Sequence, residues 1–188
     1  MNAYDFDKTI FYPDSSACFF RYCLKKHPGP VMRVLPAAIG MFIRYRKKEL
    51  GARELKQQLF SFLAELSDTE ELVASFWEEN FSRIGGWYLK QKRNDDVIIS
   101  ASPTFLLEPV CKRLGVELIA TEMDIRSGWI NGANCHDVEK PRRFYELHPG
   151  VKPEAFYSDS LSDSPMAEIS EKAYLVKKHR LSPWPGKK

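Results

Sequence analysis

The sequence predicts an α/β protein in which helices cover a parallel β-sheet and a second, all-helical segment is inserted near the N-terminus. Short apolar runs alternate with helical patterns in the C-terminal half. A further strand-like run lies at the extreme N-terminus, and the roughly 80 residues after it are helical throughout. The expected architecture is therefore one sheet whose first strand is separated from the others by a small helical bundle.

The expected strands are short and apolar, and turn residues follow most of them. Gly128 and the pair Asn131-Gly132 predict a hairpin after the third strand. The chain from 177 to 188 is basic and contains proline, which is typical of a low-complexity tail. The strands are expected at residues 3–6, 96–100, 116–121, 155–158 and 173–176.

Helices are expected between these strands. Ser102 and Pro103 supply an N-cap and a first-turn proline for a helix that ends at Gly115. Two more helices are expected at 141–148 and 162–170.

Four helices are predicted in the inserted segment. Asp14 or Ser15 caps the first, which ends near Gly29. The apolar residues of the third repeat at i, i+4, i+7 and i+8, as on one helical face, and the fourth begins at a capping box from Ser67 to Glu70. The other three helices are expected at 31–48, 53–66 and 67–86, which divides the chain into a core of 1–12 and 87–188 and an insertion of 13–86.

Composition limits the class of protein. The chain has 188 residues, of which 44% are hydrophobic and 28% charged, as in one compact domain or a domain with one sizeable insertion. This excludes collagen-like, disordered and disulfide-scaffold proteins. The four cysteines form no C-x-x-C pair, and no secretory signal is visible, so a cytoplasmic location is expected.

The net charge of +3 is unevenly distributed. Residues 21–56 contain ten basic side chains and two acidic ones, so the remainder of the chain is net acidic. The overall balance is too weak to predict nucleic-acid binding, but a basic insertion attracts anionic substrates. Its apolar run 34–43 is too short to span a bilayer and is either core of the helical insertion or an element for peripheral membrane contact.

Acidic and hydroxyl side chains follow the strands at the point where each ends. Ligands of open α/β sheets bind at these carboxyl ends. The first strand leads into Asp5 and Asp7, and the strand near 156 into Asp159 and Asp163. Converging carboxylates repel unless a cation neutralises them, and a hard divalent ion, most naturally Mg²⁺, prefers oxygen ligands. A metal site is therefore predicted here.

The same edge offers groups that hold phosphate. The Ser100 hydroxyl and the Lys140 ammonium are suited to binding a phosphoryl group. Asp5 and Asp7 alternate at a strand end, which suits one as nucleophile and the other as general acid and base. The predicted substrate is a small-molecule phosphomonoester.

In these motifs the chain resembles the haloacid dehalogenase (HAD) superfamily of hydrolases, subfamily IB, in its phosphoserine-phosphatase-like branch. The motifs are Asp5-Phe-Asp-Lys-Thr9, Ser100, Lys140 and Ser158-Asp-Ser-Leu-Ser-Asp163, which occur in the family's order over nearly the whole chain. The resemblance implies a Rossmann-like core with a four-helix-bundle type of cap.

The resemblance also implies roles for individual residues. Asp5 would be the nucleophile that forms an aspartyl-phosphate, and Asp7 the general acid and base. The implied phosphate-binding residues are Thr9, Ser100, Ala101 and Lys140. Mg²⁺ would be held by Asp5, Asp7 and Asp159, with support from Asp163.

The chain departs from phosphoserine phosphatases at two motifs. It has Ser100-Ala-Ser102-Pro where they usually have Ser-Gly-Gly, and Ser162 where they have asparagine. These forms are more similar to a broader branch that includes phosphatidylglycerophosphatase C-type enzymes, and they point away from phosphoserine as substrate.

Three alternatives remain open at this stage. The same pocket could pass the phosphoryl group to another alcohol, as a phosphotransferase does. A lipid phosphate at a membrane surface could be the substrate. A non-enzymatic phosphoacceptor domain, similar to a response-regulator receiver, also gathers acids, a hydroxyl and a lysine around Mg²⁺. The sequence does not predict an oligomeric state.

Overall fold

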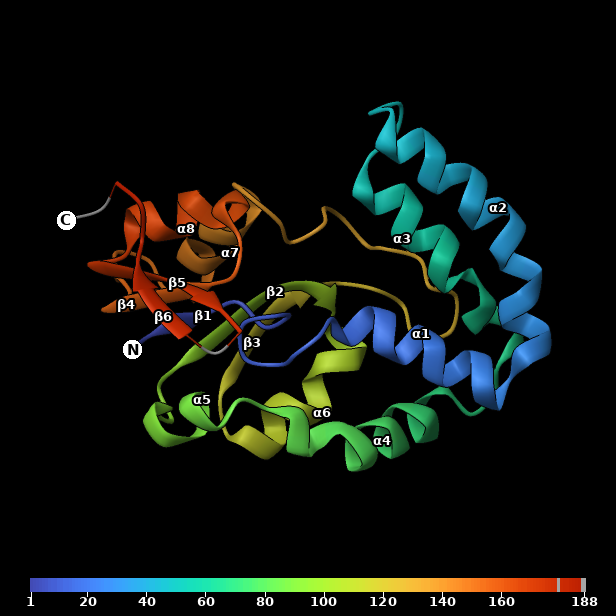
Figure 1. Ribbon diagram of the computed structural model, residues 1–188, viewed down its shortest axis with the longest axis horizontal. Helices are drawn as coiled ribbons and strands as arrows, with labels where there is room; N and C mark the ends of the chain where they lie inside the picture. The colour runs from blue at the N-terminus through green and yellow to red at the C-terminus, as the bar shows by residue number, and fades with distance from the viewer. Residues whose placement is uncertain (179, 187–188) are drawn as a thin grey trace.

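The protein folds around one six-stranded sheet (Figure 1). The structure is a computed structural model, and it describes residues 1–178 and 180–186. The strand order is β3-β2-β1-β4-β5-β6, and neighbouring strands are parallel except for β5 and β6. This confirms the α/β class with a Rossmann-like parallel core. The strands are β1 (Ala3–Tyr4), β2 (Val97–Pro103), β3 (Glu117–Thr121), β4 (Ala155–Ser158), β5 (Lys172–Lys177) and β6 (Arg180–Pro183).

The tail differs from its prediction. Residues 180–183 form the edge strand β6, antiparallel to β5, and Trp184 packs into the core beside Phe156. The sequence pattern missed β6 because all four of its residues are exposed and show no apolar alternation. Positions 179, 187 and 188 of the predicted tail lie outside the described residues.

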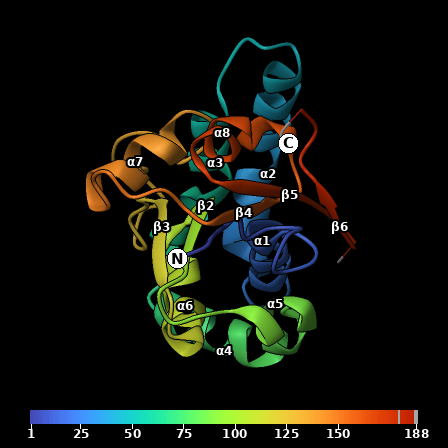
Figure 2. The ribbon, with the colours of Figure 1, turned by 90° about the vertical axis from the view of Figure 1, so that its left-hand side faces the viewer.

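Helices cover both faces of the sheet. In the view of Figure 2, α7 and α8 lie on one side, and α4, α5 and α6 on the other. The α-helices are α1 (Ser15–Lys26), α2 (Pro28–Arg46), α3 (Ala52–Phe60), α4 (Thr69–Asn80), α5 (Gly86–Gln91), α6 (Thr104–Leu114), α7 (Glu139–Leu147) and α8 (Ser164–Ile169). The 3-10 turns are η1 (Ser61–Glu65), η2 (Phe81–Arg83) and η3 (Leu161–Asp163).

The inserted helices do not all stand apart from the core. Helices α2 and α3 pair as a hairpin beyond the end of the sheet toward which β2 points (Figure 1). By contrast, α4 packs against α6, where the buried Trp77 donates its indole N–H to the Leu106 carbonyl at 2.6 Å. One hydrophobic cluster therefore joins the insertion to the sheet, and the predicted division at residues 12 and 87 stays a prediction.

Two local predictions were wrong. Ser102 and Pro103 belong to the end of β2, and α6 begins only at Thr104, because the Ser102 hydroxyl bonds to Asp7 instead of capping the helix. The capping box is also absent: Asp68 is the N-cap residue of α4, and its side chain makes no capping bond. At α1 the expectation holds, since Asp14 accepts from the Ala17 N–H at 2.9 Å.

The predicted hairpin after β3 forms and holds α3 in place. Met123 bridges Ile130, and the Ile130 carbonyl accepts from Arg53 of α3 at 3.0 Å. Gly128 has a φ of +71°, and a Cβ built there would lie 2.3 Å from the Phe60 carbonyl oxygen. Glycine therefore allows the hairpin to touch the C-terminal end of α3.

One face of α2 is apolar yet exposed. Val34 and Ala38 are buried against the neighbouring helices, whereas Ile39 and Phe42 are 59% and 52% exposed. The run 34–43 therefore contributes to the core along one side only. Across the part of the chain that the structure describes, no helix has the length and apolarity to cross a membrane.

Candidate active site

The candidate site is centred on Asp5, directly after β1 in the middle of the sheet. Its carboxylate is buried, with 8% of the residue exposed. Lys140 of α7 donates to Asp5 Oδ1 at 2.7 Å, and the Thr9 hydroxyl donates to Oδ2 at 3.2 Å. Burial raises the pKa of Asp5 to about 7, and the charge of Lys140 limits that rise.

Lys140 joins the N-terminal motif to the motif after β4. Its ammonium also contacts Asp163 Oδ2 at 2.7 Å, and the same oxygen accepts from the Ser158 hydroxyl at 2.7 Å. Burial alone would lower the pKa of Lys140, but the charges of Asp5 and Asp163 outweigh it and raise the pKa. The lysine is therefore held as a cation between two carboxylates.

Asp7 lies in a separate group of hydroxyls. The backbone N–H of Ser15 donates to Asp7 Oδ1 at 2.6 Å, and the Ser102 hydroxyl donates to Oδ2 at 2.5 Å. The Ser102 hydroxyl is also 2.8 Å from that of Ser16. Burial raises the pKa of Asp7 to about 6, while these hydrogen bonds oppose the rise. Thus β1, β2 and the start of α1 meet at Asp7.

The remaining predicted residues lie nearby with weaker connections. Ser100 is buried in the middle of β2, where its hydroxyl accepts from the Ser102 N–H at 3.1 Å. Asp159 follows β4, and burial raises its pKa. Within residues 1–178 and 180–186, neither side chain forms a hydrogen bond with Asp5.

A residue of α3 that the sequence patterns did not single out enters the site. Lys56 of α3 donates to the Ala101 carbonyl at 2.5 Å and to Asn134 at 2.8 Å. Thr121 also donates to the Ala101 carbonyl, at 2.8 Å. Burial lowers the pKa of Lys56 to about 8. In the sequence it is one of the ten basic residues between positions 21 and 56, and only the fold distinguishes it from the others.

The donor set suits a hard divalent cation. Asp163 Oδ1 is buried and has no hydrogen-bond partner among the described atoms, and a buried unpaired carboxylate oxygen favours a cation or a water molecule. As the side chains stand in the described residues, however, no group of three or more His, Cys, Asp or Glu is close enough to enclose an ion. The Mg²⁺ ligand set stays a prediction.

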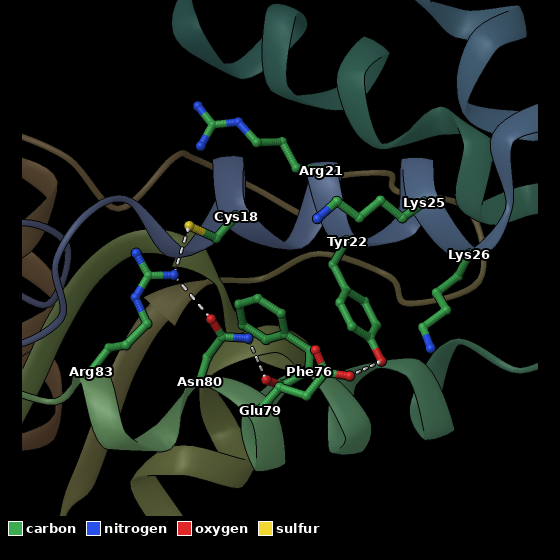
Figure 3. A pocket seen from close by; sticks show the side chains of 9 residues that line it. All are labelled: Cys18, Arg21, Tyr22, Lys25, Lys26, Phe76, Glu79, Asn80 and Arg83. Atoms are coloured by element: carbon green, nitrogen blue, oxygen red, sulfur yellow. Dashed lines mark hydrogen bonds between the residues drawn. The ribbon is translucent and has the colours of Figure 1, made fainter.

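A pocket of about 570 Å³ lies outside the candidate site, between α1 and α4 (Figure 3). Its polar groups already bond to one another: Arg83 donates to Asn80 at 3.0 Å, and Tyr22 to Glu79 at 3.4 Å. The Arg21 side chain is drawn pointing away from these bonds, toward the inserted helices above α1. None of the predicted site residues lines this pocket, so size alone does not locate the chemistry.

The fold and the order of these acidic and basic residues define a hydrolase class. The model of the haloacid dehalogenase-like hydrolases matches residues 3–168, and the chain belongs to that family. This confirms the predicted superfamily and an enzyme of the HAD hydrolase type.

Among curated proteins, the chain is 29% identical to Protein CicA of Caulobacter vibrioides over 194 aligned positions, covering 93% of this chain and 85% of that protein. Among solved structures, a protein of unknown function from Bordetella pertussis Tohama I superposes with a TM-score of 0.79 at 22% identity, covering 99% and 91% of the two chains. A substrate-bound phosphoserine phosphatase gives 0.56 at 13% identity, with 91% and 82% covered. These likenesses support a phosphoserine-phosphatase-like fold.

Proposed function

We propose that the protein is a Mg²⁺-dependent phosphomonoesterase that works through an aspartyl-phosphate on Asp5. The observation that supports this most is the difference in surroundings between two acids. Asp5 contacts the Lys140 ammonium, whereas Asp7, two residues later, accepts hydrogen bonds from the uncharged Ser15 N–H and Ser102 hydroxyl. A neighbouring cation favours the ionised form that a nucleophile needs, and burial away from a cation favours the protonated form that a general acid needs.

In the proposed reaction, an Asp5 oxygen attacks phosphorus and the bond between phosphorus and the alcohol oxygen breaks. Asp7 gives its proton to that oxygen and later takes one from the water that hydrolyses the aspartyl-phosphate. Lys140 stabilises the charge on the transferring group. Thr9, Ser100 and Ala101 would line the phosphate site. Asp5, Asp7, Asp159 and Asp163 would hold Mg²⁺, which neutralises phosphate charge when bound.

Two substitutions test the two roles. Asp5→Asn should abolish turnover, and Asp7→Asn should slow it by two orders of magnitude or more, since general acid–base catalysis contributes about 10²–10⁴-fold. Both proteins should keep the wild-type circular dichroism spectrum. A fully active Asp5→Asn enzyme contradicts the proposal, as does activity that survives chelation of Mg²⁺.

The open alternatives have their own outcomes in the same assay. A phosphotransferase would transfer phosphate to an added alcohol, and product analysis detects this. A phosphoacceptor domain would accumulate a stable aspartyl-phosphate without turnover, but the acid at position 7 argues for hydrolysis. The proposed enzyme is cytoplasmic and binds no nucleic acid.

A lipid phosphate at a membrane surface is the second candidate, and the exposed face of α2 favours it. Ile39 and Phe42 are exposed on this helix. The exposed Arg44, Arg46 and Lys47 follow them. Apolar and basic side chains together suit peripheral contact with anionic lipids.

Vesicle flotation tests this candidate. The protein should float with phosphatidylglycerol vesicles and not with phosphatidylcholine vesicles, and charge reversal at Arg44, Arg46 and Lys47 should abolish flotation. Reversal at the exposed Lys90, Lys112 and Lys152 is the matched control. Equal behaviour of the two triple variants would contradict membrane contact through α2.

A further inference from the structure

An apolar cavity of about 430 Å³ lies between α1 and α3, next to the candidate active site. Its volume is within the usual range for small-molecule sites. Most of its lining is apolar, from Phe20 on α1 and from Leu55, Leu59 and Phe60 on α3. The polar or charged side chains of the lining are Asp14, Ser16, Arg21, Tyr45 and Lys56.

Hydrogen bonds link the wall of the cavity to the catalytic groups. Ser16 lines it, and the Ser16 hydroxyl lies 2.8 Å from that of Ser102, which in turn donates to Asp7. Lys56 also lines it and bonds to the carbonyl of Ala101, in the predicted phosphate loop. The residue proposed to protonate the leaving alcohol therefore lies one hydrogen-bonded side chain away from the cavity wall.

From this proximity and from the apolar lining we infer that the alcohol part of the substrate carries an apolar alkyl group, which occupies the cavity between α1 and α3. The inference rests on the proposed function and specifies its substrate class. A small polar alcohol would leave the phenylalanine and leucine side chains of the cavity facing water. An alkyl chain in the cavity removes its own apolar surface and that of these side chains from water. Lys56 and Ser16, at the inner end, would face the polar atoms next to the ester oxygen.

A series of unbranched alkyl phosphates tests the inference. From ethyl through butyl to hexyl phosphate, kcat/KM should rise by about three- to four-fold for each added methylene, because each one buries about the same apolar area. Glycerol phosphate, of comparable length to butyl phosphate but polar, should be a poorer substrate than butyl phosphate. A flat series would overturn the inference.

A cavity variant and a matched control locate the effect. Leu55 lines the cavity and lies outside the shared hydrophobic cluster, so Leu55→Gln should fold. It should lower the ratio of hexyl to ethyl activity by ten-fold or more and leave ethyl phosphate hydrolysis within about two-fold of wild type. Leu89→Gln, at an exposed leucine of α5, should keep the wild-type ratio. An unchanged ratio in Leu55→Gln would overturn the inference.

Acetyl phosphate separates failure of this inference from failure of the proposed function, because acetate is a good leaving group and its departure needs no binding contribution from the cavity. Hydrolysis of acetyl phosphate combined with a flat alkyl series contradicts the inference about the alkyl group and leaves the proposed function standing. No hydrolysis of acetyl phosphate or of any alkyl phosphate contradicts both. Phosphatidylcholine vesicles containing phosphatidic acid distinguish the two sources of an alkyl group. Given a rising alkyl series, faster turnover than with hexyl phosphate favours a lipid as the source of the alkyl group, and slower turnover favours a soluble metabolite.

Discussion

Lys140 donates to Asp5 at 2.7 Å across a sequence separation of 135 residues. The lysine is 1% exposed, and its only described carboxylate partners are Asp5 and Asp163. Helix α7 thus supplies the positive charge for two acids that follow different strands. This arrangement serves both the chemistry proposed for Asp5 and the stability of the fold around the end of β1. The effect on activity and the effect on the free energy of unfolding can be measured separately.

Replacing Lys140 by methionine should destabilise the fold. The substitution keeps the apolar stem but leaves two buried carboxylates without their cation, and losing one partner of a buried ion pair costs about 3–5 kcal/mol. The free energy of unfolding in urea measures the loss. Lys112→Met, which breaks an exposed pair with Glu108, should change it by less than about 1 kcal/mol. Similar losses in the two variants would contradict the structural role.

Ser102→Ala should change the pH dependence of catalysis. The Ser102 hydroxyl donates to Asp7 and lowers the pKa of that carboxyl, so its removal should raise the pKa of Asp7 above about 6. If Asp7 protonates the leaving group, the alkaline limb of the kcat/KM profile moves to higher pH by about one unit. Ser182→Ala on β6 is the control. An alkaline limb that stays in place would show that Ser102 does not position the acid.

Gly128→Ala should lower the free energy of unfolding more than Gly132→Ala does. Both glycines have a positive φ, which alone costs an alanine about 1 kcal/mol. Only at Gly128 would the new methyl group meet a backbone atom, the Phe60 carbonyl oxygen. We expect a loss of about 3 kcal/mol there, from urea unfolding, against about 1 kcal/mol at Gly132. Equal losses would mean that α3 moves away from the hairpin without cost.

The parallel sheet and the edge that carries the site could be predicted from the sequence. Asp5, Ser100 and Asp159 each follow an apolar run, and parallel strands bring their carboxyl ends together whatever the details of the loops. The contact of Lys140 with Asp5 and Asp163 could not be derived from pattern alone, because no local signal fixes where the N-terminal end of α7 meets the sheet.

Side chains with two possible partners were the least predictable. Ser102 has the sequence context of a helix N-cap, yet Asp7 offers its hydroxyl a charged acceptor, and charge-assisted bonds are the stronger ones. Lys56 is one of ten basic residues between positions 21 and 56, and the sequence alone does not distinguish it from the other nine. Only the packing of the hairpin against α3 turns it toward Ala101.

Lys56 should make the stability of the protein depend on pH. Its pKa falls from the ordinary 10.5 to about 8 in the folded protein because of burial, so the unfolded chain holds this proton more tightly. Between those two pH values the unfolded state binds more protons, and the free energy of unfolding therefore rises with pH. Lys56→Met removes this contribution.

The difference in unfolding free energy between wild type and Lys56→Met should thus increase by the order of 3 kcal/mol from about pH 7 to about pH 10. Urea unfolding at a series of pH values measures it, and Lys47→Met, at an exposed lysine of the same insertion, is the matched control and should show no such increase. A constant difference for Lys56→Met would mean that the ammonium stays hydrated. In that case α3 would not close over the Ala101 loop as tightly as the 2.5 Å contact indicates.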